Sequence, residues 1–444
     1  MSRLADALKA ASETRALVIG PGVLNQVAEL FNEQFPDKKA VVVADTITYG
    51  IAGKTVYDAL KAAGIELEET FIFTDPHLYA EYKFVDQLAD SLKNHDAIPV
   101  AVGSGTINDL TKLAAHLTGR QYMCVATAAS MDGYTAFGAS ITADGAKQTF
   151  NCPAPQACLA DIDIISKAPA EMTASGYADL FAKITAGADW ILADSLKVEA
   201  IDEKAWSIVQ DGLHDALSDP EGVRAGDPEA ISKLVEGLML GGFAMQWSKS
   251  SRPASGAEHQ FSHLWNMENH LNNGEHISHG FQVSIGTLAV TAMYDRLLKT
   301  SADQLDVEKA LNHWPSREAS DAAALAIFVG TDFPEIGLQE TGAKYSNAEQ
   351  LKAQLDLLKN NWSEIQAKLT DQLVPLAEAK RRLELVGAPT EPEHIGITRE
   401  RLRETFIRAQ FIRRRFTLLD VAVRAGLLDQ WLDELFGKGG IWEI

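Results

Sequence analysis

The sequence predicts an α/β protein with a doubly wound N-terminal domain built on a parallel sheet and an all-helical C-terminal domain. From residue 15 to about residue 162, short apolar runs alternate with segments of helical spacing, the pattern of a parallel sheet covered by helices. After Pro169, which suits the first turn of a helix, helical periodicity continues with almost no β-type runs. A chain of 444 residues also exceeds the size of a single core, so we expect two domains, residues 1–167 and 168–444.

The individual elements can be placed along the chain from these patterns. Five apolar runs are expected to form the strands: "ALVIG" (16–20), "AVVVAD" (40–45), "TFIFT" (70–74), "IPVAVG" (98–103) and "MCVATA" (123–128). Helical spacing lies between them, as in "GVLNQVAELFNEQF", "AGKTVYDALKAAG" and "YAEYKFVDQLADSL". The clear non-helical stretch of the second half is "VGAPTEPEHIGIT" (386–398), after which Thr398 can cap the next helix.

Charge and hydrophobicity exclude two classes of partner. A formal net charge of -21 repels a phosphodiester backbone, so we expect no nucleic-acid binding. The one basic run, Arg413 to Arg415 in "IRRRF", lies in a helix-like segment rich in Glu and Leu, and we interpret it as a solvated face or a set of ion pairs. No stretch approaches the roughly 18 apolar residues of a membrane span, so no stable membrane insertion is expected.

The N-terminus and the cysteines favour a reducing, cytoplasmic location. In "MSRLADALKAASETRALVIG", charged residues interrupt what would be the apolar core of a signal peptide. The three cysteines, Cys124, Cys152 and Cys158, are an odd number without CxxC spacing. This argues against both a disulfide framework and a thiolate zinc site.

Two stretches have the character of ligand-binding loops at the carboxyl ends of strands. In "IPVAVGSGTINDL", a buried strand runs through Gly103 to Thr106 into a helix, whose first N–H groups can hold phosphate. The alternative is an ordinary tight βα turn. In "ATAASMDGYTAFGAS" (126–140), small and hydroxyl residues follow the next strand, where open α/β sheets bind ligands. Asp132 in this stretch is able either to bond a substrate hydroxyl or to form a turn.

Three further residues suggest a metal site. Asp179 falls on an apolar helix face in "GYADLFAK", where it needs either the ion pair with Lys183 or a metal. In "SGAEHQFSHLW", His259 and His263 share one helical face, so they can share a metal, divide metal binding and proton handling, or lie inert on the surface. His279 starts a further helix in "ISHGFQVSIG". Asp179, His259 and His279 together would leave coordination positions open for substrate, as in catalytic sites.

Five motifs together resemble the sn-glycerol-1-phosphate dehydrogenases, a family of the iron-containing alcohol dehydrogenase and dehydroquinate synthase-like superfamily. They are "GSGTIND", "TAASMDGY", "GYADLFAK", "SRPASGAEHQFSH" and "HGFQVSIG", in this order. The resemblance runs from about residue 15 to 290, and "FTLLDVAVRAGLL" is similar to the longer, bacterial form. It implies a Rossmann-like domain that binds NAD(H) or NADP(H) and a helical domain that holds one divalent metal ion, zinc, nickel or iron.

The resemblance also assigns residues. The metal ligands are Asp179, His259 and His279, while His263 and Asp132 contact substrate and His263 is our candidate for proton relay. The cofactor-binding positions are Gly103, Ser104, Gly105, Thr106, Ile107, Thr127, Ala128, Ala129, Ser130 and Ala136, the last where some relatives have serine.

Two assignments rest on residue chemistry. Asp45, after the second strand, would accept from a ribose 2'-hydroxyl and favours NAD(H), unless it is only a helix cap. Arg252 in "SSRPASG" is the first choice for binding a substrate phosphate, Lys183 and Lys249 are the second, and an ion pair is the alternative for all three.

The expected activity is therefore the reversible, metal-assisted reduction of dihydroxyacetone phosphate to sn-glycerol-1-phosphate, a precursor of lipid backbones. The rival hypotheses are a glycerol dehydrogenase that acts on unphosphorylated polyol and a catalytically silent protein that binds nucleotide or metal. Dehydroquinate synthase fits less well, because the additional Lys and Arg positions that hold its substrate are not found. Relatives are commonly dimers or larger homo-oligomers, and we expect subunit packing to be the role of residues 300–444.

Overall fold

The chain forms two compact units that interleave along the sequence. A computed structural model describes residues 3–143 and 146–444. Unit 1 comprises Met1–Leu180, Lys204–Ser251 and Leu385–Gly387, and unit 2 comprises Phe181–Glu203, Arg252–Glu384 and Ala388–Ile444. The chain thus passes between the units more than once, whereas the sequence suggested one crossing after residue 167. The predicted domain boundary after residue 167 stays a prediction.

Unit 1 is built on a six-stranded parallel sheet of order β1-β8-β5-β4-β2-β3. Its strands are β1 (Ala16–Gly20), β2 (Ala40–Asp45), β3 (Phe71–Phe73), β4 (Ile98–Gly103), β5 (Met123–Ala126) and β8 (Ala157–Asp161). All five predicted strands are present. The sixth, β8, was not among them, although it lies buried between β1 and β5.

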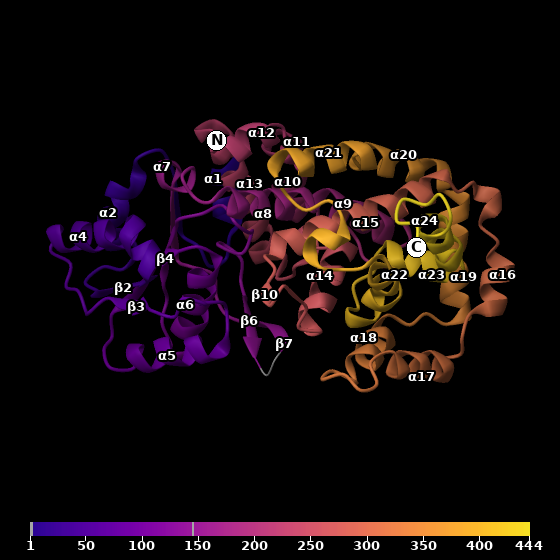
Figure 1. The fold of residues 1–444 in the computed structure, drawn as a ribbon, viewed down its shortest axis with the longest axis horizontal. Helices are drawn as coiled ribbons and strands as arrows, with labels where there is room; N and C mark the ends of the chain where they lie inside the picture. Colours follow the sequence, from indigo (N-terminus) through magenta and orange to yellow (C-terminus); the bar gives the residue numbers. More distant parts are fainter. Residues whose placement is uncertain (1–2, 144–145) are drawn as a thin grey trace. The chain divides into compact units, whose positions relative to one another are not determined.

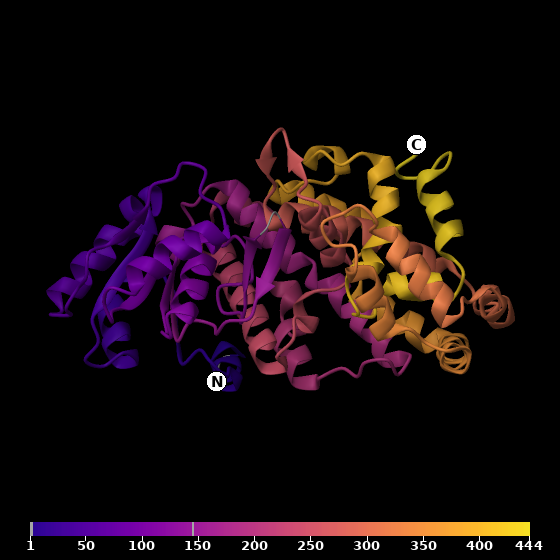
Figure 2. The same ribbon diagram turned by 90° about the horizontal axis from the view of Figure 1, so that it is seen from below.

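The burial of these strands explains their sequences. Every residue of β4, β5 and β8 is buried, since helices cover both faces, so each strand is a continuous apolar run rather than an alternating one. The edge strand β1 is only half-buried. Figure 1 shows α2 and α4 on one side of the sheet and α5 and α6 on the other, and Figure 2 gives the same elements from below. The parallel, doubly wound fold predicted from the sequence is confirmed.

The helices of unit 1 come before, between and after the strands of the sheet along the chain. They are α1 (Arg3–Ala10), η1 (Val23–Gln26), α2 (Val27–Gln34), α3 (Thr46–Thr48), the π-helical η2 (Tyr49–Gly53), α4 (Lys54–Ala62), α5 (Tyr82–Leu92), α6 (Gly105–Leu117), α7 (Ile162–Ile165), α8 (Ala170–Phe181), α10 (Glu203–Gln210), α11 (Leu213–Ala216), α12 (Pro220–Ala225) and α13 (Pro228–Ser248). An antiparallel hairpin of β6 (Ala139–Ala143) and β7 (Ala146–Phe150) was not predicted, because "ASITA" and "AKQTF" lack the apolar runs of the sheet strands.

Unit 2 is helical apart from a short hairpin, β9 (Leu271–Asn272) and β10 (Glu275–His276). Its helices are α9 (Lys183–Ser195), η3 (Arg252–Ala254), α14 (Ala257–Met267), α15 (His279–Lys299), η4 (Ala302–Gln304), α16 (Val307–His313), α17 (Arg317–Ile327), α18 (Ile336–Lys344), α19 (Ala348–Asn360), α20 (Trp362–Gln372), α21 (Leu376–Val386), η5 (Pro392–Ile395), α22 (Arg399–Arg408), η6 (Ala409–Ile412), α23 (Leu418–Arg424) and α24 (Leu428–Phe436). Thr398 caps α22 by accepting from Arg401 N–H at 3.1 Å, as predicted.

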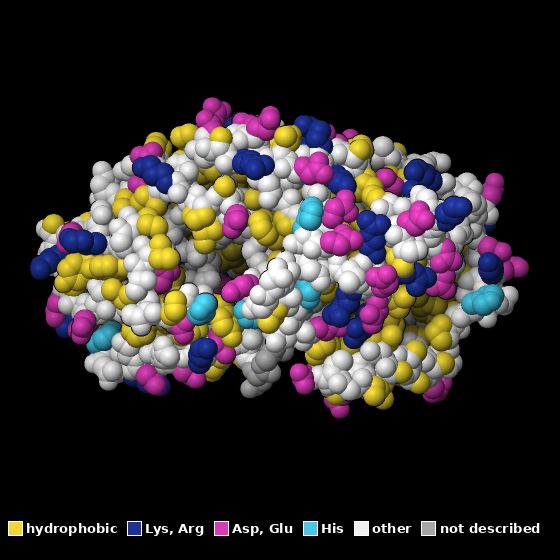
Figure 3. Space-filling model, in the orientation of Figure 1, with side chains coloured by type: hydrophobic (Ala, Val, Ile, Leu, Met, Phe, Trp, Pro, Cys, Tyr) yellow, Lys and Arg dark blue, Asp and Glu magenta, His cyan; other side chains and the backbone are white. Residues whose placement is uncertain are grey.

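Charged side chains of both signs are mixed on the surface. On the face drawn in Figure 3, Lys and Arg lie among Asp and Glu rather than apart from them. Arg414 of the basic run pairs with Glu340 at 2.7 Å, which confirms the ion-pair interpretation for this residue, while Arg415 donates to Ser255. Arg413 to Arg415 follow η6 as extended chain rather than helix. Among the described residues, no helix combines the length and apolarity that a membrane crossing requires.

Candidate functional site

The turn after β4 is closely packed around its glycines. A Cβ added to Gly103 would lie 2.5 Å from Cβ of Ile107, and one on Gly105 would lie 2.7 Å from Cε of Met131. Ser104 is the N-cap of α6, yet its side chain bonds none of the first amides of the helix. The turn therefore presents the positive end of a 13-residue helix, which suits a phosphate.

The second predicted loop lies directly beside this turn. β4 and β5 are neighbours, Gly103 pairs with Ala126, and Thr127 N–H donates to Gly103 O at 3.1 Å. Tyr134 Oη donates to Ala128 O at 2.7 Å, which fixes the loop's path. The structure thus brings together the residue stretches 103–107 and 127–130, which the sequence analysis assigned to cofactor binding. Their contact with a cofactor stays a prediction.

A buried lysine that the sequence analysis missed holds the end of this loop. Lys112 of α6 is 1% exposed, and its Nζ donates to the carbonyl oxygens of Gly133, Ala136 and Gly138, each at 2.9 Å. Its ion pair with Asp109 is 3.5 Å long. A lysine directly before the apolar "LAA" was the available signal. Ala136 therefore contributes its carbonyl oxygen to the scaffold of the loop.

Asp45 caps a helix. Its Oδ1 accepts from the N–H groups of Ile47 at 2.8 Å and Thr48 at 2.7 Å, and the Thr48 hydroxyl accepts from Asp45 N–H. The structure thus supports the alternative that the sequence left open. The ribose contact, and with it the preference for NAD(H), stays a prediction.

Asp179 lies fully buried in the last turn of α8, where the chain passes from unit 1 into unit 2. Its Oδ2 accepts from the backbone N–H of Asp132 at 2.9 Å, so the predicted substrate contact adjoins the predicted metal ligand. Gly176, one turn earlier, is required for this approach, because a Cβ there would lie 1.9 Å from Ala129 O.

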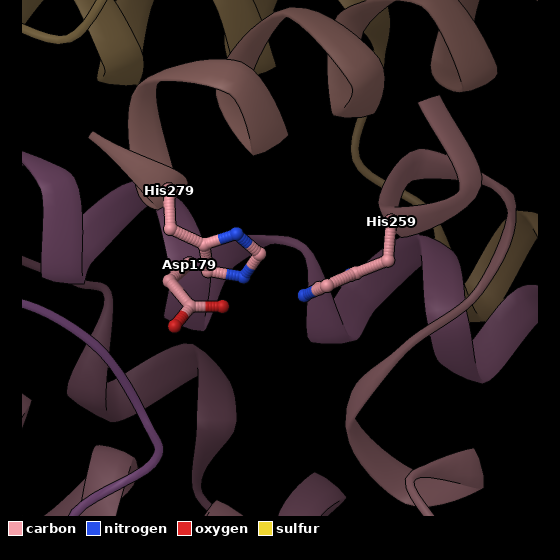
Figure 4. Close-up of side chains that lie close together, drawn as sticks. All are labelled: Asp179, His259 and His279. Atoms are coloured by element: carbon pink, nitrogen blue, oxygen red, sulfur yellow. The ribbon is translucent and has the colours of Figure 1, made fainter. Parts of the chain in front are cut away.

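Three imidazoles gather within unit 2. The ring centroids of His259 and His279 are 5.2 Å apart, and that of His263 lies 6.3 Å from His259 and 6.4 Å from His279. One ligand atom each from Asp179, His259 and His279 lies within 4.8 Å of the other two. Figure 4 shows these three side chains directed at a common space. This is the trio that the sequence analysis chose, with His263 beside it.

The Nδ1 atom of His259 is hydrogen-bonded to a carboxylate. Nδ1 lies 2.8 Å from Oε1 of Glu258, which also accepts from Gly256 N–H at 2.6 Å, while Oε2 accepts from the Thr185 hydroxyl at 3.0 Å. Burial opposes ionisation of Glu258, but the hydrogen bonds from His259 and Gly256 outweigh it and lower the pKa below its usual value. An ionised Glu258 requires a proton on Nδ1 and so leaves the Nε2 lone pair for a metal.

The Nδ1 atom of His279 is hydrogen-bonded to a hydroxyl. Ser262 Oγ lies 3.3 Å from His279 Nδ1 and donates to Gln282 Oε1 at 2.9 Å. Gln282 must present its oxygen to Ser262, because its Nε2 donates to Asn266 Oδ1 at 3.0 Å. The single Ser262 proton is thereby used, so His279 Nδ1 donates and Nε2 carries the lone pair.

The donor set fits a divalent transition metal. One carboxylate oxygen and two unprotonated Nε2 atoms match the open three-ligand sites of zinc, and the same set accommodates iron, nickel or cobalt. Both imidazoles are oriented by partners on their far side, as metal-ligating histidines are. Neither Glu258 nor Ser262 was singled out from the sequence, although Glu258 directly precedes a predicted ligand.

Arg252, the predicted phosphate contact, is 2% exposed and has several partners inside unit 2. Its Nη1 donates to Phe416 O at 2.9 Å, its Nη2 to Asp189 O at 3.0 Å, and its Nε lies 3.3 Å from Glu199. Of the second choices, Lys183 is fully buried and Lys249 pairs with Glu13 at 3.1 Å. The structure favours the ion-pair alternative for Arg252 and Lys249, and phosphate binding by any of the three stays a prediction.

Comparisons with known proteins agree with the fold and with the motifs. Residues 18–169 match the model of the iron-containing alcohol dehydrogenase family. A probable glycerol dehydrogenase from Sinorhizobium meliloti has a similar fold, with a TM-score of 0.58 at 16% identity over 94% of this chain and 97% of that one. At that identity the likeness extends to the fold alone.

Sequence relatives define the family more closely. A glycerol-1-phosphate dehydrogenase from Halalkalibacterium halodurans is 33% identical over 284 residues, 64% of this chain and 71% of the relative. One from Pyrococcus horikoshii is 32% identical over 294 residues, 66% of this chain and 82% of the relative. Both relatives carry NAD(P)+ in their names. The chain is therefore an oxidoreductase of the glycerol-1-phosphate dehydrogenase family, within the iron-containing alcohol dehydrogenase superfamily.

Proposed function

We propose that the protein catalyses the reversible reduction of dihydroxyacetone phosphate to sn-glycerol-1-phosphate by NADH or NADPH. The observation that carries this proposal is the convergence of Asp179, His259 and His279, whose imidazoles contact Glu258 and Ser262 through Nδ1, in a chain of this family. The NAD(P)+ in the names of its relatives supports the cofactor, and the glycine turn at Gly103 to Gly105 suits a pyrophosphate.

The chemistry divides between the bound groups and the side chains. A divalent cation held by the three ligands would supply Lewis acidity toward a ketone oxygen, and the reduced nicotinamide would supply the hydride. In this proposal Asp132, whose backbone N–H donates to Asp179 Oδ2 at 2.9 Å, accepts from a substrate hydroxyl. His263, one turn along α14 from His259, delivers the proton that the alkoxide product requires.

A phosphorylated substrate also needs a cation at its far end, and we propose Lys147 for this role ahead of Arg252. Lys147 is half-buried on β7, and its ammonium has no hydrogen bond or ion pair with any residue that the structure describes. Burial lowers its pKa, although the negative charges of Asp109 and Asp179 oppose that change. A desolvated, unpaired ammonium in the same unit as Asp132 and Asp179 is stabilised by an incoming phosphate.

The test is NADH oxidation by metal-loaded protein with dihydroxyacetone phosphate and, separately, dihydroxyacetone. We expect preference for the phosphorylated ketone and a product that an enzyme specific for sn-glycerol-3-phosphate refuses. Lys147→Ala should raise KM for the phosphorylated ketone more than tenfold, while the exposed Lys61→Ala control should not. Preference for the bare ketone would reassign the protein as a glycerol dehydrogenase, and no turnover despite bound metal would leave a silent binding protein.

A further inference from the structure

We propose that Glu258 is a positioning residue for the metal: its carboxylate holds His259 with Nε2 toward the ligand space and supplies buried negative charge that strengthens cation binding. This inference rests on the metal site of the proposed function, but not on the identity of the substrate. It assigns a role to a residue that would bind neither metal nor substrate.

The first support is the completeness of the Glu258 hydrogen bonds. The side chain is fully buried, and its oxygens accept from Gly256 N–H, His259 Nδ1 and the Thr185 hydroxyl at 2.6, 2.8 and 3.0 Å. Adjacent residues of a helix normally point in directions about 100° apart, so they rarely bond each other. Glu258 bonds His259 because it curls back over the first turn of α14, where Gly256 is the N-cap.

The second support is that the fold provides Glu258 with no bonded cation. Among the described residues, the side chains that hydrogen-bond Glu258 are those of His259 and Thr185, neither a Lys nor an Arg, and the buried Arg415 acts on it electrostatically. A buried carboxylate is costly unless it is compensated by an opposite charge. A divalent cation on the other side of the His259 ring would add to the positive charge of Arg415, acting through a ring that carries one proton on Nδ1.

The alternative is a helix cap. A carboxylate in the first turn of a helix that accepts from the N-cap amide stabilises the helix without any metal. Both roles use the same hydrogen bond to Gly256, so removal of the whole side chain would not separate them. A useful variant must keep the hydrogen bonds and remove only the charge.

Glu258→Gln is such a variant. The amide oxygen can take the place of Oε1 and accept from Gly256 and His259 as before. The amide NH2 then donates to the Thr185 hydroxyl oxygen, whose proton turns to the Ala182 carbonyl, 3.0 Å away. Glu268→Gln is the matched control, because it removes the same charge at the other end of α14, where Glu268 pairs with Arg408 at 2.6 Å.

The experiment is a titration of metal-free full-length protein with Co²⁺, followed through the visible absorption of the bound ion. We expect wild type and Glu268→Gln to bind one equivalent with equal Kd, and Glu258→Gln to bind roughly 10- to 100-fold more weakly with a shifted spectrum. The metal-free Glu258→Gln protein should keep the wild-type Tm, since its hydrogen bonds persist.

Two results would overturn the proposal. An unchanged Kd and spectrum in Glu258→Gln would leave Glu258 as a helix cap, while the metal site itself would stand. Failure of the wild type to bind Co²⁺ stoichiometrically would remove both this inference and the metal of the proposed function. Because no substrate is present, neither result depends on which ketone the enzyme reduces.

Discussion

Asp189 and Glu258 are two fully buried carboxylates of unit 2 that flank Gly256 and have different partners. A Cβ on Gly256 would lie 2.5 Å from Asp189 Oδ2 and 2.9 Å from Glu258 Oε2. Asp189 accepts from Ala257 N–H at 2.7 Å, Leu418 N–H at 2.8 Å and Tyr294 Oη at 2.6 Å. It therefore joins the first turns of α14 and α23 to α15, whereas Glu258 bonds a metal ligand. Burial is the same for both, and only the partners distinguish scaffold from site.

The two carboxylates also differ in charge. Burial and the neighbouring negative charge of Glu258 raise the pKa of Asp189 to about 7, whereas hydrogen bonds lower that of Glu258. Two adjacent buried carboxylates rarely ionise together, because each opposes the charge of the other. The Glu258 carboxylate beside His259 therefore stays ionised, whereas the Asp189 carboxylate takes up a proton more readily.

Removal of a ligand should have the largest effect. His259→Ala deletes one of three donors and the partner of Glu258, so we expect loss of bound metal and a fall in kcat of about 10³-fold or more. Metal content and NADH oxidation with dihydroxyacetone phosphate are the measurements. His214→Ala, at an exposed histidine of α11, is the control and should behave as wild type. Full activity in His259→Ala would place the metal elsewhere.

Asp189→Asn tests the scaffold side of the comparison. The two oxygens of Asp189 accept separately from Ala257 N–H and Leu418 N–H. The Asn side chain has only one acceptor oxygen, so it cannot replace both bonds. One buried N–H is left unpaired, and we expect a loss of about 2–3 kcal/mol of unfolding free energy. Urea unfolding of the metal-free protein at about pH 8, above the pKa of Asp189, measures this loss, which Glu258→Gln should not show. Equal stabilities of the two variants would break the distinction between scaffold and site.

The raised pKa of Asp189 predicts a pH dependence of stability. Its pKa is about 7 in the folded protein and about 4 when unfolded, so between these values the folded state binds more protons. The contribution of Asp189 is fully present below about pH 4 and is lost as pH rises toward 7, at up to about 1.4 kcal/mol per pH unit. The difference in unfolding free energy between wild type and Asp189→Asn should shrink over that range. A pH-independent difference would mean that Asp189 stays ionised.

The sequence predicted the sheet and the metal trio for different reasons. Central strands such as β4 are buried on both faces and so are visible as apolar runs, whereas β6 alternates buried and half-buried residues and its hairpin with β7 was not predicted. The trio came from motif resemblance, with polar residues in apolar surroundings as local support. The roles of Lys112, Glu258 and Ser262 were not predicted, because they depend on partners that only the fold brings near. Lys112 bonds three loop carbonyl oxygens, while Glu258 and Ser262 contact the Nδ1 atoms of His259 and His279.

The smallest effect is expected at the second imidazole. Ser262→Ala removes a neutral acceptor from His279 Nδ1, 3.3 Å away, whereas Glu258→Gln removes a charge from beside His259. Loss of a neutral hydrogen bond is worth about 1 kcal/mol, so Co²⁺ affinity should fall only about fivefold, less than in Glu258→Gln. The same Co²⁺ titration compares the two variants directly. If Ser262→Ala weakened Co²⁺ binding as much as Glu258→Gln, the orientation of the imidazole rings rather than buried charge would govern the affinity for Co²⁺. The Glu258 carboxylate would then differ from the Ser262 hydroxyl only in geometry.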